Sequence, residues 1–264
     1  MNQKLTFVII ASENDLTVKK TFDSISKIGK ILLVDGGPRK NSEFSIAETI
    51  SLKKLAVLHS ATYLERKYDY AAAQYNFGLS HVDTEWAFII DSDEIVSKDL
   101  KSWLLTGDFG SKDYFLVKRF NFFLNQKIAH GPFKPDWNIR LFKKSLCIYE
   151  DRKVHARMEV NGNGGKAPSY IEHYTVQTID QFVLKMIEFT ALEKDSRAKS
   201  NSSNEFKSLV RFVLQRLPFQ PSLRFIYSYW FKLGFLDGKI GYLLARSASY
   251  YEVLVHLRKF EYDE

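Results

Sequence analysis

The chain has 264 residues, of which 45% are hydrophobic and 15% aromatic, so it has enough apolar side chains for a large folded core. A single cysteine, Cys147, excludes an internal disulfide framework and a cysteine-rich zinc site. The net charge is +7, and residues 106–264 carry the excess because residues 1–105 are close to neutral. This basic half indicates either an anionic partner or a solvated basic surface.

The N-terminal segment does not read as a secretion signal, because the apolar run Leu5–Ala11 is too short and lacks a basic flank. No stretch approaches the roughly 20 apolar residues that span a bilayer. We therefore expect a cytoplasmic protein.

The first half of the chain alternates short apolar runs with amphipathic stretches. The expected strands are Leu5–Ala11, Ile31–Val34, Ala56–His59 and Trp86–Ile90. The expected helices between them are Leu16–Ile28, Ser45–Leu52 and Tyr70–His81. This alternation predicts an α/β fold with a parallel sheet, in which ligands bind outside the carboxyl ends of the strands.

The pattern changes after Lys112. A strand at Tyr114–Phe123, a turn at Leu124–Gln126, a strand at Asn138–Phe142 and a turn at Asn161–Gly165 are expected. Helices are then expected at about 179–199, 204–217, 222–235 and 238–258. We expect an α/β catalytic domain over residues 1–175 and an α-helical C-terminal appendage over 176–264.

Polar residues follow three of the expected strands. Ser12-Glu13 follows the first, Asp35 the second, and Asp91-Ser92-Asp93-Glu94 the strand at Trp86–Ile90. Acids this close repel one another, so a hard cation such as Mg²⁺ or Mn²⁺ is a natural partner. Such an ion binds diphosphates and neutralises charge on a departing phosphate oxygen. The structural alternative is an acid-rich helix N-terminus before Leu100–Leu105.

Eight segments spread over nearly the whole chain resemble one known family in their order and spacing. They are Phe7–Asn14, Leu32–Gly37, Gln74–Leu79, Ile90–Glu94, His130–Phe142, Val154-His155, Ile171–Tyr174 and Gly234–Gly238. Together they resemble glycosyltransferase family 2, closest to the bacterial lipopolysaccharide-core type. The resemblance implies a GT-A (Rossmann-like) fold, lipopolysaccharide or polysaccharide biosynthesis, and inverting sugar transfer from a nucleotide sugar, commonly UDP-linked.

The resemblance also implies roles for particular residues. The nucleotide-sugar donor is assigned to a set from the strand ends and the third expected helix: Ser12, Glu13, Asp35, Gln74, Asn76, Asp91, Ser92 and Asp93. In relatives, the Asp-x-Asp acids and a histidine hold the metal, which makes Asp91, Asp93 and His155 the expected ligands of Mn²⁺ or Mg²⁺. Arg140 resembles a residue near the acceptor or the diphosphate.

The segment His130–Arg140 contains one glycine and two prolines, so it is expected to be a shaped loop. Trp137 offers a flat face on which an acceptor sugar could pack, next to Arg140. The structural alternative is an ordinary rigid loop in which Arg140 forms a salt bridge.

An inverting transfer needs a general base for the acceptor hydroxyl. Many relatives carry Glu directly after the Val-His pair, but this chain has Ala156 there. We expect Asp136 to substitute for it, with Glu150 and Asp151 as runners-up.

Basic and aromatic residues are interleaved along the expected C-terminal helices. This mixture suits peripheral contact with the inner face of the cytoplasmic membrane, where a glycan or lipid-linked acceptor would be available. The alternative is a helical subdomain whose aromatic residues form its core or an oligomer interface. Nucleic acid is not expected, because the acidic strand ends would repel a phosphate backbone.

Two other functions stay open at this stage. A nucleotidyltransferase would favour a glycine-rich, lysine-bearing phosphate loop near the N-terminus, and residues 11–17 lack one. A catalytically silent glycan-binding protein or membrane scaffold is favoured by Ala156 alone.

Overall fold

The computed structural model describes residues 4–12, 17–37, 51–150, 157–199 and 219–260. The chain divides into two compact units. Unit 1 consists of Met1–Phe120 and Asp136–Tyr174, and unit 2 consists of Asn121–Pro135 and Thr175–Glu264. The break at residue 174 lies next to the predicted boundary, but the segment 121–135, which we expected in the first domain, groups with the C-terminal helices. The functional division between the two parts stays a prediction.

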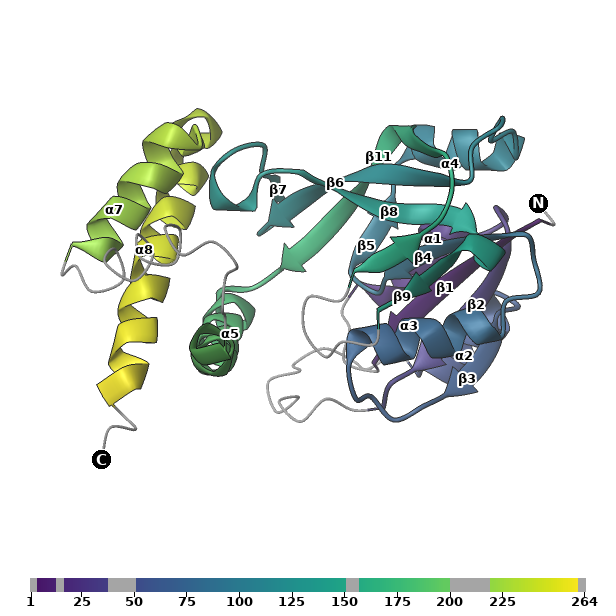
Figure 1. Ribbon diagram of the computed structural model, residues 1–264, viewed down its shortest axis with the longest axis horizontal. Helices are drawn as coiled ribbons and strands as arrows, with labels where there is room; N and C mark the ends of the chain where they lie inside the picture. The colour runs from purple at the N-terminus through teal and green to yellow at the C-terminus, as the bar shows by residue number, and fades with distance from the viewer. Residues whose placement is uncertain (1–3, 13–16, 38–50, 151–156, 200–218, 261–264) are drawn as a thin grey trace. The chain divides into compact units, whose positions relative to one another are not determined.

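Unit 1 contains four parallel strands, three of which match predicted ones. They are β1 (Leu5–Ala11), β2 (Lys30–Asp35), β3 (Thr62–Glu65) and β4 (Trp86–Asp91). β1 lies between β2 and β4 and pairs with both in parallel, while β3 lies outside β2 (Figure 1). The parallel α/β arrangement predicted from the sequence is therefore confirmed.

Helices cover both faces of this parallel sheet. They are α1 (Val18–Ile25), α2 (Leu52–Leu58), α3 (Ala71–Ser80) and α4 (Lys98–Thr106). On β1, Phe7 and Ile9 enter the core cluster that also contains residues of α1, α2 and α4, whereas Val8 and Ile10 enter the cluster with Tyr75 and Leu79 of α3. Because both faces are covered, the strand is a continuous apolar run without polar alternation.

The expected strand at Ala56–His59 is wrong, because this segment is the end of helix α2. Leu52, Leu55 and Ala56 are buried at the i, i+3, i+4 spacing of a helix, and Val57 and Leu58 are exposed. The short apolar run was misread as a strand, and the third strand is instead β3, whose alternation is weak. The expected helix Ser45–Leu52 lies largely outside the described residues.

Antiparallel strands extend the sheet beyond β4. They are β5 (Glu94–Val96), β6 (Tyr114–Phe123), β8 (Asp136–Lys143) and β11 (Gly164–Val176). Among the described residues the strand order is β3-β2-β1-β4-β8-β6-β11-β5. A short 3₁₀ helix, η3 (Lys144–Leu146), leads from β8 to the hairpin of β9 (Cys147–Tyr149) and β10 (Met158–Val160).

Unit 2 contains the C-terminal helices and a short excursion from the sheet. Its described elements are β7 (Gln126–Lys127), η2 (Gly131–Phe133), α5 (Ile179–Lys199), α7 (Gln220–Ile226), η4 (Tyr227–Phe231), η5 (Gly234–Asp237) and α8 (Gly238–Phe260). The helix expected at 222–235 is divided into an α-helix, a π-helical turn and a 3₁₀ turn, and Leu233, with a φ of 60°, separates the last two. The helix expected at 204–217 lies outside the described residues.

The excursion 121–135 is attached to the C-terminal helices by Asp237. The Asp237 carboxylate accepts hydrogen bonds from the backbone N–H groups of Ala129 (3.1 Å) and His130 (2.8 Å) and lies 2.9 Å from His130 Nδ1. These contacts explain why the loop expected at His130–Arg140 is divided, with η2 in unit 2 and β8 in unit 1. Across the part of the chain that the structure describes, none of the helices is both long and apolar enough to cross a bilayer.

Candidate active site at the strand ends

The parallel register places the acids that follow β2 and β4 at one edge of the sheet. Ala11 pairs with Asp35, and Ile10 pairs with Asp91, so both acids flank the end of β1. The Asp35 carboxylate accepts hydrogen bonds from the Gly37 N–H (2.8 Å) and from the Tyr63 hydroxyl. A carboxylate has about four lone-pair sites, so Asp35 keeps capacity to accept from a ligand.

The turn after β4 is held from two sides. The Ser92 carbonyl accepts hydrogen bonds from the hydroxyls of Thr17 (3.1 Å) and Thr21 (2.8 Å), and the Asp93 carbonyl accepts one from the Tyr174 N–H (2.8 Å). The Asp93 side chain is 31% exposed, and its Oδ2 lies 3.3 Å from His173 Nε2. The turn therefore presents the Asp93 carboxylate on a fixed backbone, beside the similarly exposed Asp91.

Behind this turn, acidic and basic side chains alternate in a chain of ion pairs. Arg140 Nη2 lies 3.1 Å from Asp91 Oδ2 and also pairs with Glu94. Glu94 lies 3.5 Å from Arg119, and Arg119 binds Asp136 with two hydrogen bonds of 3.1 Å and 2.8 Å. We call these five residues the ion-pair chain. It links Asp91, at the end of β4, to Asp136, at the start of β8.

A β-bulge positions Arg140 within this chain. In the pairing of β8 with β6, Leu141 faces Phe115 and Ile139 faces Leu116, so Arg140 has no partner across the ladder. A bulge redirects a side chain and breaks the strict alternation of faces. It turns Arg140 into the interior, where 5% of the residue is exposed. The Arg140 Nε is buried and makes no hydrogen bond within the described part of the chain.

The ion-pair chain shifts the acids in opposite directions. Burial alone would raise the pKa of Asp91, but the Arg140 charge and the hydrogen bond from Tyr75 outweigh it and hold this pKa below its ordinary value. Burial, with the nearby Asp91 charge, raises the pKa of Glu94 in spite of Arg140. The pKa of Arg140 is raised well above its ordinary value, because the Glu94 and Asp91 charges outweigh the cost of burial.

Asp136 is also held in its ionised form. Burial would raise its pKa, but the hydrogen bonds and charge of Arg119 lower it overall. A carboxylate with a lowered pKa is ionised at neutral pH but is a weaker proton acceptor. Both of its oxygens are bonded to Arg119, so Asp136 is better suited to hold Arg119 than to take a proton.

Comparison with known proteins gives distant relatives among curated sequences. The lipopolysaccharide core biosynthesis glycosyltransferase LpsC of Rhizobium meliloti (strain 1021) is 21% identical over 262 residues, covering 97% of this chain and 92% of the relative. No family model matches the chain.

Solved structures give a second comparison. The mannosyltransferase PcManGT from Pyrobaculum calidifontis, in complex with GDP-Man and Mn²⁺, has a TM-score of 0.51 at 10% identity, covering all of this chain and 89% of that one. Residues 1–349 of S. aureus TarS in complex with UDP give a TM-score of 0.44 at 12% identity, covering 99% and 93% of the two chains.

The chain has the GT-A glycosyltransferase fold. The GT-A sheet predicted from the sequence is thereby confirmed, with its C-terminal helices. The strand edge that carries Asp35, Asp91 and Asp93 is the edge at which α/β sheets bind ligands.

Within this GT-A sheet, the structure brings together several of the predicted site residues. Asp35, Asp91 and Asp93 lie at the strand ends, with Ser12 and Ser92 buried next to them. Arg140 and Asp136 belong to the ion-pair chain. The predicted residues Glu13, Asp151 and His155 lie outside the described residues, as does Ala156.

Other predicted site residues are used inside the protein. Gln74 is fully buried and bonds both the Arg66 carbonyl (2.7 Å) and the Arg66 guanidinium (2.9 Å). Asn76 bonds the backbone of Tyr149 in both directions, at 2.9 Å and 3.0 Å. Both side-chain amides are already hydrogen-bonded within the protein. Their predicted roles in binding the nucleotide sugar are untested, and these bonds do not favour them.

Trp137 and Glu150 are not members of the ion-pair chain. Adjacent residues on a strand point to opposite faces, so Trp137 faces away from Asp136, and Lys166 Nζ lies 4.8 Å from the centre of its ring. Glu150 follows β9, and its N–H donates to the Arg157 carbonyl at 2.9 Å. Their predicted acceptor and base roles are untested.

A divalent ion needs several oxygen or nitrogen ligands gathered around one point. In the described ranges no group of three His, Cys, Asp or Glu side chains is arranged to hold a metal ion. Asp91 is occupied by Tyr75 and Arg140. Asp93 with His173 supplies one carboxylate and one imidazole, and Mg²⁺ is commonly bound through one or two carboxylates and substrate phosphates. Asp93 and His173 would therefore need further ligands, such as the phosphates of a bound substrate, to complete a metal site.

The sequence analysis assigned no role to three residues that contact the predicted site: Tyr75, Glu94 and Arg119. Tyr75, on α3, donates its hydroxyl to Asp91 and stacks on Tyr149 at 4.9 Å. Glu94 and Arg119 form the middle of the ion-pair chain, and His173 faces Asp93. Tyr75, Glu94 and His173 lie within segments that carry the family resemblance, but their pairings depend on tertiary packing and strand register, which have no local sequence signal.

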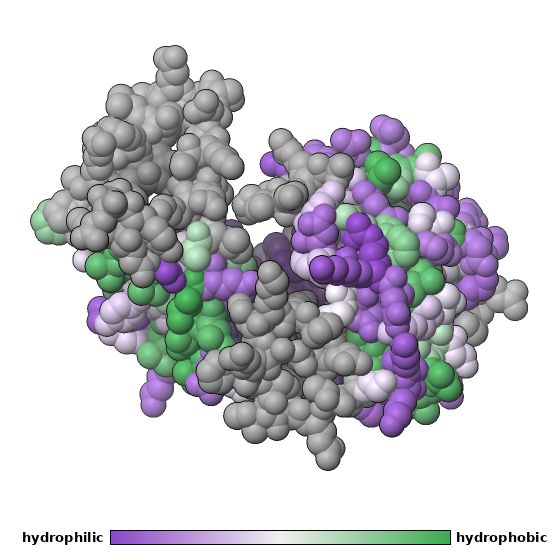
Figure 2. All heavy atoms as spheres, turned by 90° about the horizontal axis from the view of Figure 1, so that it is seen from below, coloured by the Kyte–Doolittle hydropathy of each residue, from purple (hydrophilic) through white to green (hydrophobic). Residues whose placement is uncertain are grey.

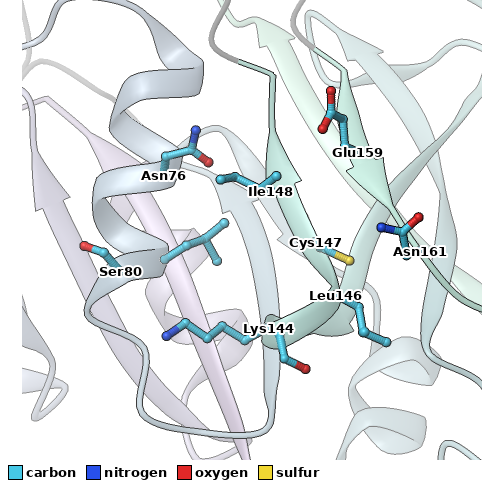
Figure 3. A pocket seen from close by; sticks show the side chains of 10 residues that line it. Asn76, Ser80, Lys144, Leu146, Cys147, Ile148, Glu159 and Asn161 are labelled. Atoms are coloured by element: carbon cyan, nitrogen blue, oxygen red, sulfur yellow. The ribbon is translucent and has the colours of Figure 1, made fainter.

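A separate cavity of about 500 Å³ lies between α3, η3, β9 and β10, lined by Asn76, Lys144 and Glu159 among others (Figure 3). The Lys144 N–H bonds to the Glu85 carbonyl, just before β4, so the cavity lies toward the opposite strand end from Asp91. Burial and the Asp113 charge raise the pKa of the Cys147 thiol in its wall to about 12. The thiol is therefore protonated at neutral pH and is a poor nucleophile.

Proposed function

We propose that the chain is an inverting glycosyltransferase of family 2 type. It transfers a sugar from a nucleotide-sugar donor, UDP-linked in our expectation, to a hydroxyl of a cell-surface glycan or lipid-linked acceptor. The observation that carries this proposal is the convergence of Asp35, Asp91 and Asp93 at the ligand-binding edge of a GT-A sheet. The similarity to LpsC favours an acceptor in the lipopolysaccharide core.

The donor nucleotide is assigned to the edge formed by β1, β2 and β4. The partly free carboxylate of Asp35 is suited to accept hydrogen bonds from ribose hydroxyls. Asp93 and His173 would hold a divalent ion, Mn²⁺ or Mg²⁺, which when bound neutralises charge on the departing diphosphate. PcManGT was solved with Mn²⁺ and a nucleotide sugar, which supports this assignment.

The ion-pair chain positions the acids of this edge. Arg140 compensates the Asp91 and Glu94 charges, which allows the two carboxyl groups to lie beside one another. The Nε–H group of Arg140 makes no hydrogen bond to the described residues. This supports a role for Arg140 in binding the negatively charged nucleotide sugar. Arg119 and Glu94 act through Arg140 and Asp136 and are positioning residues.

The base that deprotonates the acceptor hydroxyl is assigned to Glu150 or Asp151 in preference to Asp136. The reason is the double hydrogen bond from Arg119, which lowers the proton affinity of Asp136. The proton passes to the carboxylate while the hydroxyl oxygen attacks the anomeric carbon opposite the leaving diphosphate.

A donor screen tests the proposal. UDP-, GDP- and dTDP-sugars are added to the full chain with Mn²⁺ or Mg²⁺, and Tm and nucleoside diphosphate release are measured. Donor binding raises Tm by mass action, and UMP, which lacks the diphosphate, serves as the matched control. The proposal fails if no nucleotide sugar raises Tm more than UMP does and none is turned over.

The same screen tests the catalytically silent alternative, which Ala156 favours. Tight glycan binding without turnover of any nucleotide sugar would support that alternative over the transferase.

A further inference from the structure

Unit 2 exposes a row of large apolar side chains along α7 and η4. Their spacing is that of one helix face, with members at i, i+4, i+7, i+8, i+11 and i+12. The members are Phe219, Leu223, Ile226, Tyr227, Trp230 and Phe231. Each is more than 40% exposed, up to 76% for Phe231. We call these six residues the apolar stripe.

The opposite face of the same segment is packed against the rest of unit 2. Phe225 and Tyr229 stack at 5.4 Å, and both contact Tyr242 of α8 edge-on, at 5.7 Å and 5.8 Å. Ser228, between them, is buried. Figure 1 shows α7 alongside α8. The apolar stripe is therefore the outward face, an inversion of the pattern expected for a surface helix in water.

The charged side chains around the stripe are mainly positive. Between residues 219 and 246 the basic residues are Arg224, Lys232, Lys239 and Arg246, and the single acid is Asp237. The Asp237 side chain is 7% exposed and is bound to His130. Arg224 lies 3.9 Å from the buried Glu252, which offsets part of its charge.

The cations of this region also crowd one another. Burial, together with the Arg224 and Lys134 charges, lowers the pKa of Lys232. Such a gathering of like charges is relieved when an anion lies next to it.

We propose that the apolar stripe, with Arg224, Lys232 and Lys239, docks the protein onto the surface of a lipid bilayer that contains anionic lipid. An amphipathic surface with aromatic residues on one side and basic residues beside it binds in the plane of a membrane interface. Trp and Tyr are enriched at that interface, since one end of the ring is apolar and the other polar. The positive charges complement the negative surface of anionic lipid.

Exposed apolar residues are not confined to this region. In the space-filling view, hydrophobic side chains appear among hydrophilic ones on the face shown (Figure 2). In α2 of unit 1, Val57 and Leu58 are 81% and 69% exposed, but they follow Lys53 and Lys54 without a row of further apolar side chains. These two residues are a matched control for the stripe.

The test is flotation of the full chain with vesicles, measured without donor or acceptor. Vesicles of phosphatidylcholine alone are compared with vesicles of equal parts phosphatidylcholine and phosphatidylglycerol. The chain is expected to float with the anionic vesicles, less with the neutral ones, and progressively less as salt is raised.

Substitutions of two kinds then separate the apolar and the charged contributions. The double variant Trp230→Ser, Phe231→Ser is expected to lower partitioning roughly tenfold or more, while Val57→Ser, Leu58→Ser leaves it unchanged. Lys232→Gln and Lys239→Gln are each expected to lower partitioning about fivefold, and replacement of either lysine by Arg is expected to retain it. Circular dichroism and Tm confirm that each variant is folded.

Several results would overturn the proposal. One is absence of flotation with anionic vesicles, and another is an equal loss in the Val57→Ser, Leu58→Ser control. A third is a wild-type dimer in solution that the Trp230→Ser, Phe231→Ser variant converts to monomer, which would assign the stripe to a second copy of the chain. The proposal does not depend on the transfer reaction. Vesicle binding without sugar transfer would contradict only the enzyme assignment. Sugar transfer without vesicle binding would contradict only the docking surface.

Discussion

At the scale of single residues, Arg140 connects the acids of the strand ends. It is almost completely buried, it pairs with Asp91 and Glu94, and a β-bulge in β8 turns it inward. A buried charge is tolerated when its partners are in place and becomes costly when one of them is removed. The arrangement thus depends on all of its members.

The substitution Arg140→Met is expected to lower the free energy of unfolding by about 3–5 kcal/mol, because it removes the cation beside Asp91 and leaves the buried Glu94 with only its 3.5 Å contact to Arg119. Denaturant unfolding measures the loss. The control is Lys30→Met, which breaks the exposed Lys30–Asp83 pair and is expected to cost less than about 1 kcal/mol. Adding Glu94→Gln to Arg140→Met should restore part of the stability; a purely additive loss would contradict the ion-pair chain.

The lowered pKa of Asp136 predicts a dependence of stability on pH. A carboxyl whose pKa is lower in the folded than in the unfolded state stabilises the protein above its ordinary pKa, and this contribution is lost as the pH falls. The wild type is therefore expected to be more stable than Asp136→Asn at pH 7, and this difference should shrink below about pH 4. Urea unfolding over a pH series measures it. A difference that is constant with pH would refute the assigned shift.

The choice of general base is tested by three parallel substitutions. Either Glu150→Gln or Asp151→Asn is expected to lower kcat roughly a hundredfold or more with little change in the donor KM. Asp136→Asn should have the smaller effect on kcat, since its carboxylate is committed to Arg119. If Asp136→Asn alone abolished turnover, Asp136 would be the base.

At the scale of elements, helix α3 carries Tyr75 to Asp91 by lying close to β1 and β2. Gly78 permits this approach, because a Cβ there would lie 2.6 Å from Val8 Cγ1 and 3.1 Å from Val34 Cγ2. Both contacts are with side chains of buried strands. The close packing of α3 against β1 and β2 therefore depends on the absence of a side chain at Gly78.

The substitution Gly78→Ala is expected to destabilise the protein by about 1–3 kcal/mol through overpacking, although alanine is the better helix former. Thermal unfolding measures the effect, with Ser80→Ala at an exposed position of the same helix as the control. A stabilised Gly78→Ala variant would show that α3 does not lie as close to the sheet as described.

The elements also show which parts of the fold could be predicted. β1 and β4 are long apolar runs followed by acids, so both the strands and the chemistry at their ends were predicted from the sequence. Helix α2 was missed because a short apolar run fits a strand as well as a buried helix segment. The Arg119–Asp136 pair was not predicted, since residues 124–135 separate the two strands and local sequence does not set their register.

At the scale of the whole molecule, the two units are suited to different tasks. Unit 1 has the GT-A sheet with acids at its ligand-binding edge, and unit 2 has the apolar stripe beside exposed cations. In the proposed account, the first holds the nucleotide sugar and the second holds the protein at the membrane that carries the acceptor. The two activities should be separable by substitution, as the vesicle and donor experiments require.

The central claim is that the Asp93 carboxylate holds the donor diphosphate through a divalent ion. The most direct measurement is nucleoside diphosphate release by wild type and Asp93→Asn, with Mn²⁺ and the nucleotide sugar that the donor screen identifies. The account predicts a loss of at least about a hundredfold in Asp93→Asn and none in the exposed control Asp83→Asn. Wild-type turnover by Asp93→Asn would contradict it.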